Sequence, residues 1–102
     1  MLELRPNCEL CDRDLPPESA DARICTYECT FCVTCVHTVL HNVCPNCGGG
    51  FVPRPIRPAT AHRQGVSLDH HPASNKRVVT SRSKAEIEAF VAGLRSIPPE
   101  DR

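Results

Sequence analysis

Apolar residues recur with the spacing of a helix in two stretches of the chain. Near the C-terminus, four of them fall at i, i+3, i+4 and i+7: Ile87, Phe90, Val91 and Leu94. Ser83 and Glu86 are spaced as a capping box at the start of this stretch, and Pro98-Pro99 stops it. The pattern predicts an amphipathic helix over residues 83–97. A helix of this length is marginally stable alone, so its apolar stripe needs a surface to cover.

The second apolar repeat lies in the middle of the chain and begins after Cys32. Its members, again at i, i+3, i+4 and i+7, are Val36, Val39, Leu40 and Val43. They predict a short helix that ends near Asn42. The residues just before it, 23–31, are rich in β-branched and aromatic side chains, and this composition predicts a strand or hairpin.

Residues 53–82, between the two repeats, show no apolar periodicity. Four prolines interrupt them, together with scattered arginine, histidine and serine: Pro53, Pro55, Pro58 and Pro72. Such a composition is typical of an extended or flexible connector. The chain is thereby divided into a module over residues 1–52, a connector over 53–82 and a helix over 83–97.

Composition indicates how so small a module folds. The chain has 102 residues, three phenylalanines, one tyrosine and no tryptophan, so its apolar core is small and needs a staple. Eight cysteines, all between Cys8 and Cys47, supply one. Disulfides would require export, but the N-terminus lacks the basic and apolar segments of a signal peptide, and no stretch has the length of a membrane span. We therefore expect a cytoplasmic protein that uses its cysteines to bind metal.

The cysteines form four closely spaced pairs, which are Cys8/Cys11, Cys25/Cys29, Cys32/Cys35 and Cys44/Cys47. A two-residue gap lets both sulfurs of a pair face one ion, and zinc takes four sulfurs in a tetrahedral site. Eight cysteines thus fill two closed sites, which are structural because no position is left for a catalytic water. Either consecutive or alternate pairs can share an ion, and the spacing alone leaves both arrangements open.

The order of these gaps resembles a RING finger. The segment Cys29-Thr30-Phe31-Cys32-Val33-Thr34-Cys35 is similar to the centre of that family, and Cys44-Pro45-Asn46-Cys47 to its last knuckle; Cys29 stands where most members carry histidine. The resemblance implies a small α+β, cross-braced, binuclear treble-clef zinc finger. It also implies alternate pairing, with one zinc ion on Cys8, Cys11, Cys32 and Cys35 and a second on Cys25, Cys29, Cys44 and Cys47. The N-terminal stretch further resembles a bacterial family of small eight-cysteine proteins with no assigned function.

Ubiquitin-ligase RING fingers contact a conjugating enzyme through three features: an apolar residue inside the first Cys-x2-Cys, an aromatic residue after the central helix, and a proline in the last knuckle. The chain has Leu10 and Pro45 at two of these positions but no tryptophan. Leu10 can equally cover the metal knuckle, and Pro45 can stiffen its turn. Ligase activity is therefore an alternative, and no nucleophile–base pair, phosphate loop or open metal site points to another enzyme.

Three further features define the remaining alternatives. The last knuckle is also similar to that of rubredoxin, so iron is the alternative metal and a redox protein the alternative class. Residues 1–50 carry three basic and seven acidic residues, a net −4, whereas residues 51–102 carry nine and five, a net +4. The basic half could contact nucleic acid, but it lacks interleaved aromatic residues to stack on bases. His37 and His41 are alternative ligands, although the eight cysteines already pair off.

The function that the sequence favours is a protein-interaction or adaptor module with structural zinc sites and no enzymatic activity. We expect its partner to be another protein or a second copy of the chain, contacted through the stripe of the C-terminal helix: Ile87, Phe90, Val91 and Leu94. Metal stabilises the module without help from this helix, and the connector has no apolar pattern that predicts folding. We therefore expect the helix to pack on a partner and not on the chain's own module. Nucleic acid and membranes are not expected partners.

Overall fold

A three-stranded antiparallel sheet forms the centre of the computed structural model, which describes residues 1–102. Its strands run in the order β2-β1-β3 and are β1 (Ala22–Ile24), β2 (Thr30–Cys32) and β3 (Val52–Pro53). The hairpin predicted over residues 23–31 is confirmed. Its connecting loop carries Cys25 and Cys29, so the hairpin brings these two cysteines to one end of the sheet.

The central helix follows β2 without a break. It begins as α1 (Val33–Cys35) and continues as η1 (Val36–Leu40), which is a turn of π-helix. At its start the Cys35 backbone N–H donates to the Cys32 sulfur at 3.4 Å, and at its end His41 adopts the left-handed conformation with φ of 47°. The predicted short helix is confirmed. Its π winding was not predicted, because apolar spacing does not distinguish one wide turn from an α-helical one.

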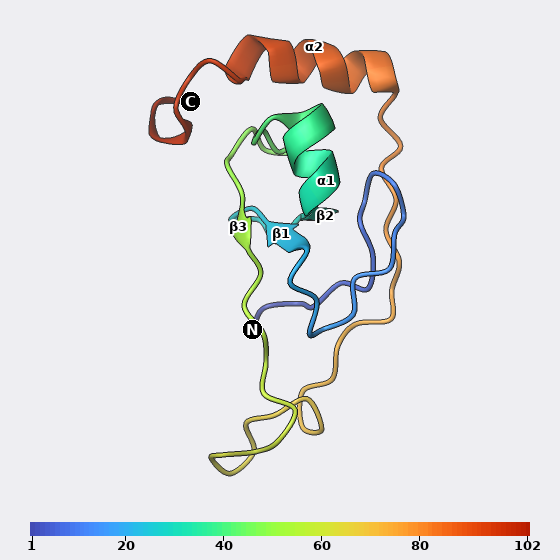
Figure 1. The fold of residues 1–102 in the computed structure, drawn as a ribbon, viewed down its shortest axis with the longest axis vertical. Coiled ribbons are helices and arrows are strands. Elements are labelled where there is room, and N and C mark those ends of the chain that lie inside the picture. The colour runs from blue at the N-terminus through green and yellow to red at the C-terminus, as the bar shows by residue number, and fades with distance from the viewer.

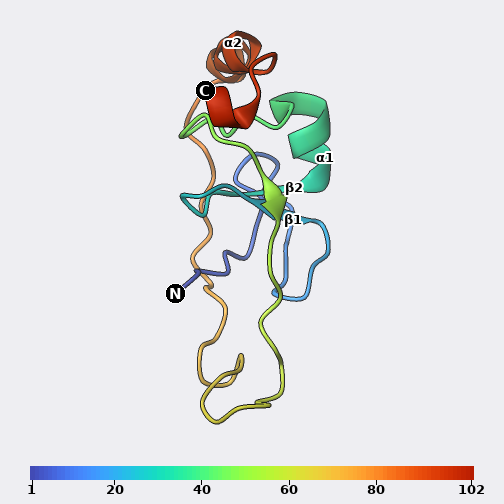
Figure 2. The same cartoon turned by 90° about the vertical axis from the view of Figure 1, so that its left-hand side faces the viewer.

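The C-terminal helix α2 (Lys84–Leu94) lies across one end of the module, close to η1 (Figure 1 and Figure 2). Ser83 caps it, since its hydroxyl accepts the Glu86 N–H at 3.1 Å. The Glu86 carboxylate accepts from the Arg82 guanidinium, also at 3.1 Å. A short 3-10 turn, η2 (Pro99–Asp101), follows. The predicted helix and its Ser83 cap are therefore confirmed, but the helix ends at Leu94 and not at residue 97, and the second half of the capping box is absent because Glu86 binds Arg82.

The apolar stripe of α2 packs on the module of its own chain. Ile87 and Val91 are only 2% and 3% exposed and belong to the core, whereas Phe90 stays 41% exposed. Gly48, with φ of 81°, makes room for the helix, because a Cβ there would lie 3.1 Å from Leu94 Cδ1. The preference for a partner as the surface that receives this helix is thus corrected for Ile87 and Val91. An apolar stripe indicates that a face is covered, not which surface covers it.

The connector runs from β3 to the far end of the molecule and returns beside the turn that contains Cys8 and Cys11, the first cysteine turn (Figure 1). Residues 54–83 contain no helix or strand. The returning segment (residues 74–82) is nevertheless tied down. The buried Asn7 side chain exchanges two hydrogen bonds with the Val78 backbone, at 2.9 and 3.3 Å, and the Thr80 N–H donates to the Glu9 carbonyl at 2.8 Å. The connector therefore has a defined path on the module.

The core is small and rich in cysteine. Six of the fourteen residues in its main cluster are cysteines, so core formation depends on how these sulfurs are accommodated. Among the others, Phe31 of β2 is fully buried and meets Phe51 edge-on, with ring centroids 5.4 Å apart. Apolar packing of this extent is too limited to stabilise the fold unaided.

Candidate metal centre

Four cysteines from two separate parts of the chain converge on one point. The sulfurs of Cys8, Cys11, Cys32 and Cys35 all lie within 4.8 Å of one another. Cys8 and Cys11 come from a tight turn near the N-terminus, closed by the Asp12 N–H donating to the Cys8 carbonyl at 2.9 Å. Cys32 ends β2 and Cys35 ends α1, so the strand-to-helix junction aims both sulfurs at that turn.

The spacing of these sulfurs fits a metal ion and not a disulfide. The Cys11 and Cys32 sulfurs are 3.8 Å apart. A disulfide would require about 2.05 Å, whereas four sulfurs at about 2.3 Å around a tetrahedral zinc ion are separated by about 3.8 Å. The N–H of Cys35 also donates to the Cys32 sulfur, which is the kind of contact that stabilises a thiolate. The donor set is thus suited to zinc.

A second cluster lies at the other end of the hairpin. The sulfurs of Cys25, Cys44 and Cys47 lie within 4.8 Å of one another. Cys44 and Cys47 belong to a turn in which the Gly48 N–H donates to the Cys44 carbonyl at 2.7 Å and the Gly49 N–H to the Cys47 sulfur at 3.4 Å. The two cysteine clusters are therefore compatible with two metal ions.

Cys29 lies outside this group of three, although it was predicted to be a ligand of the second site. It is buried, and its carbonyl accepts the Cys25 N–H at 3.3 Å across the hairpin loop. Glu28, just before it, has a left-handed backbone with φ of 65°, which turns the chain at this point. The loop thus holds Cys29 next to the second cluster without completing a set of four.

Burial makes four of these eight thiols weaker acids in the absence of a cation. Burial raises the pKa of the Cys8, Cys29, Cys35 and Cys44 thiols. For Cys32 the same effect is outweighed by hydrogen bonds, first from the Cys35 N–H, and the pKa falls. Thiolates buried this way repel one another and lose hydration, so a bound divalent ion is the natural counter-charge.

A buried carboxylate that was not predicted from the sequence joins the two cysteine turns. Glu9, between Cys8 and Cys11, is only 4% exposed. One of its oxygens accepts the Thr30 N–H at 2.8 Å and the Arg5 guanidinium at 2.9 Å; the other accepts the Asn46 amide at 3.3 Å. Asn46 lies in the turn of the second cluster, so Glu9 connects the two sites. An acidic residue inside a cysteine turn was the available signal, but its partners are set by the fold.

Several basic residues of the connector make contacts within the chain. Arg54 is buried and donates to the carbonyls of Arg5, Leu15 and Pro16, at 2.8, 3.2 and 3.0 Å, and burial lowers its pKa. Arg77 forms ion pairs at 2.9 and 2.7 Å with two carboxylates of the first turn, Asp12 and Asp14. These side chains hold the connector in place.

His37 and His41, the alternative ligands, belong to neither cysteine cluster. No helix of the structure combines the length and apolarity that crossing a membrane requires.

Comparison with known proteins places this cysteine pattern in a family. The family described as "Protein of unknown function (DUF1272)" matches residues 1–57, more than half of the chain. The chain belongs to this family. An uncharacterised protein of Rhizobium meliloti (strain 1021) is 60% identical over 89 residues, which are 87% of this chain and 99% of that protein. No solved structure matches the chain.

The expected family of eight-cysteine proteins without assigned function is therefore identified as DUF1272. The similarity to the Rhizobium protein also extends beyond the DUF1272 match. A match of 89 residues within 102 takes in the whole connector and much of α2, so these parts belong to the shared unit together with the cysteine module.

Proposed function

We propose that this protein is a structural zinc module of the RING-like, cross-braced type that acts as an adaptor between proteins. The observation that carries the proposal is the grouping of the sulfurs. Cys8 and Cys11 lie with Cys32 and Cys35, although Cys25 and Cys29 come between them in the sequence. Cys25 lies with the last pair. This alternation favours a cross-braced treble-clef arrangement. It disfavours the arrangement in which consecutive cysteine pairs share an ion.

In this proposal Cys29 is the fourth ligand of the second ion. Its burial and its hydrogen-bonded position beside Cys25 support the assignment. Both sites then have four sulfurs and no open position, so they stabilise the fold and perform no chemistry. Zinc is favoured over iron because it serves structural sites of this composition without redox activity.

The adaptor role is supported by apolar side chains exposed near the second cluster. Tyr27, in the loop between Cys25 and Cys29, is 73% exposed, and Val52 on the edge strand β3 is largely exposed. Exposed aromatic residues of this kind are common anchors in protein interfaces. We do not extend the proposal to ligase activity, since Leu10 packs against the core and Pro45 is buried.

The test combines metal analysis with capture experiments. The purified chain should contain two zinc ions. After cobalt substitution, Cys32→Ser should abolish the site of Cys8 and Cys11, and Cys29→Ser the site of Cys44 and Cys47. A single ion per chain, or a Cys29→Ser protein that loses the Cys8 site instead, would contradict the cross-brace; an iron-coloured protein would contradict the metal.

For the adaptor role, the full chain should capture a protein from its host, and Tyr27→Ser should weaken capture while both zinc ions stay bound. Capture that survives this substitution would remove Tyr27 from the interface. A chain that discharges ubiquitin from a conjugating enzyme would favour the ligase alternative.

A further inference from the structure

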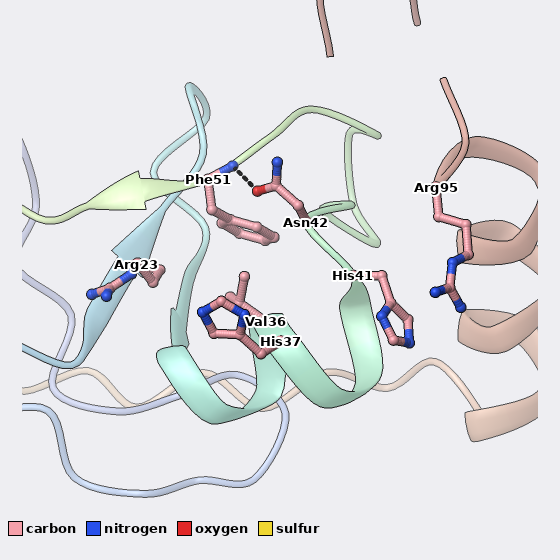
Figure 3. Close-up of a pocket in the computed structure, with 7 residues that line it drawn as sticks. All are labelled: Arg23, Val36, His37, His41, Asn42, Phe51 and Arg95. Carbon is pink, nitrogen blue, oxygen red and sulfur yellow. Dashed lines mark hydrogen bonds between the residues drawn. The ribbon is translucent and has the colours of Figure 1, made fainter. Parts of the chain in front are cut away.

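A cavity of about 500 Å³ is bounded by the central helix, by Arg23 of β1 and Phe51 just before β3, and by Arg95 just after α2 (Figure 3). Its apolar part is formed by Val36 and Phe51. The polar side chains around it are basic or neutral, and no carboxylate is among them: Arg23, His37, His41, Asn42 and Arg95. All of this lining except Phe51 and Arg95 comes from residues 1–50, the acidic half of the chain, so the absence of acids is a property of the site and not of the local composition.

Except for Arg23, the side-chain donors around the cavity have no acceptor within the chain. Eight of the ten arginines donate to internal carbonyls or carboxylates, and the two that do not are Arg63 and Arg95. The Arg95 side chain points toward the ring of His41 (Figure 3). His41 makes no side-chain hydrogen bond, and the amide nitrogen of Asn42 makes none. Arg23 instead binds the carbonyls of Ala20 and Ala22, so its charge is already engaged.

The backbone at the same place adopts conformations that ordinary residues avoid. The π-helical turn η1 ends in two consecutive left-handed residues, His41 with φ of 47° and Asn42 with φ of 63°. Glycine would adopt this conformation at lower cost. Asn42 is fixed by its side-chain oxygen, which accepts the Phe51 N–H at 2.9 Å. Both π-turns and strained backbone cluster at functional sites, where they hold side chains in place.

We propose that this cavity binds a small oxyanion, namely the phosphate or carboxylate group of a small organic molecule. Arg95 supplies the positive charge, and His41 and Asn42 donate hydrogen bonds to the oxyanion. Val36 and Phe51 contact the apolar part of the ligand. The neighbouring hollow, which shares His41 and Arg95, contains Glu88, but its carboxylate pairs with Lys84 at 3.9 Å. The proposal is independent of the adaptor role.

The test titrates the zinc-loaded full chain with inorganic phosphate and, separately, with acetate, at an ionic strength held constant with chloride. We expect saturable binding followed by NMR shifts at His41 and Asn42. Arg95→Gln should weaken it at least about tenfold, whereas Arg63→Gln, at the other arginine without an internal partner, should leave it unchanged. Saturation by either anion supports the proposal and identifies the group. Saturation by neither, or equal weakening in the two variants, would overturn it.

A second variant separates binding from a merely structural role. His41→Gly relieves the left-handed strain, so it should raise the thermal midpoint of the zinc-loaded chain. It also removes a donor from the cavity, so phosphate or acetate should bind several-fold more weakly. A variant that is more stable and still binds both anions as the parent chain does would show that His41 only ends the helix.

Discussion

Glu9 is a buried carboxylate of the first cysteine turn that also contacts the second. Its two oxygens accept hydrogen bonds from three different parts of the chain: the backbone of Thr30, the guanidinium of Arg5 and the amide of Asn46. Removing an acceptor from a buried network leaves its donors unsatisfied, which costs more than the net value of the hydrogen bonds themselves. Glu9 should therefore contribute to stability although it binds no metal.

Replacing Glu9 by glutamine should destabilise the zinc-loaded chain by about 1–3 kcal/mol, because an amide NH2 would face the donors of Arg5 or Asn46. The measurement is urea unfolding at fixed zinc concentration. Glu3→Gln is the matched control, since Glu3 contacts the same arginine at 3.8 Å from a more exposed position and should change stability by less than about 1 kcal/mol. If the two variants lose the same free energy of unfolding, the effect comes from the charge of Arg5 alone.

Single residues also show how far sequence reasoning reaches. The cysteines could be identified as candidate ligands because short-range spacing determines whether two sulfurs can face one ion. Glu9 and Asn7 could not, since their partners lie up to 71 residues away and only the folded topology brings them together. The same limit explains Cys29. Its spacing marks it as a ligand, but the loop conformation decides its distance from the second cluster.

At the level of elements, α2 is the helix that the sequence specified most completely. Its Ser83 cap and its apolar stripe are local properties, and both are present in the structure, although the helix ends at Leu94 and not at residue 97. Its docking is not local. The helix packs beside η1 and over Gly48, where a missing side chain permits close contact, and neither feature follows from the helix's own residues. Local periodicity therefore predicted helix α2 but not the surface on which it packs.

The position of α2 leads to a prediction about metal retention. Ile87→Asn should destabilise the chain by about 2–5 kcal/mol and speed the loss of zinc to a chelator, because it places an amide in the core. Ala89→Asn, on the exposed face of the same helix, controls for helix propensity and should cost less than about 1 kcal/mol. If both variants release zinc at the rate of the parent chain, α2 does not support the module.

At the scale of the whole molecule, the returning segment links the cysteine module to α2, two parts that the composition of the chain separates. Residues 74–82 contact the first cysteine turn through Asn7, Glu9 and the Arg77 ion pairs, and they deliver the chain to α2. The sequence predicted a flexible connector there because it lacks apolar periodicity, and its flexibility stays a prediction. Hydrogen bonds to backbone groups leave no periodic pattern in the sequence. The contacts of residues 74–82 with Asn7 and Glu9 could therefore not be predicted.

Chains of three lengths test this linkage. A chain ending at residue 57 should bind two zinc ions but lose that of the first cluster fastest, since Asn7 and Glu9 lack their partners at Val78 and Thr80. A chain ending at residue 82 should recover much of the retention, and the full chain the remainder. The measurement is the rate of zinc transfer to a chelator. Equal rates for all three would mean that the cysteine module is self-sufficient.

The hydrogen bonds between Asn7 and Val78 also imply an order of events during synthesis of the chain. During synthesis the first cysteine turn leaves the ribosome 71 residues before the backbone that will satisfy Asn7. All four sulfurs of the first cluster, by contrast, are available once Cys35 has emerged. An ion captured at that stage would hold the turn in shape while the rest of the chain is made. The returning segment would then close over a structure that metal has already set.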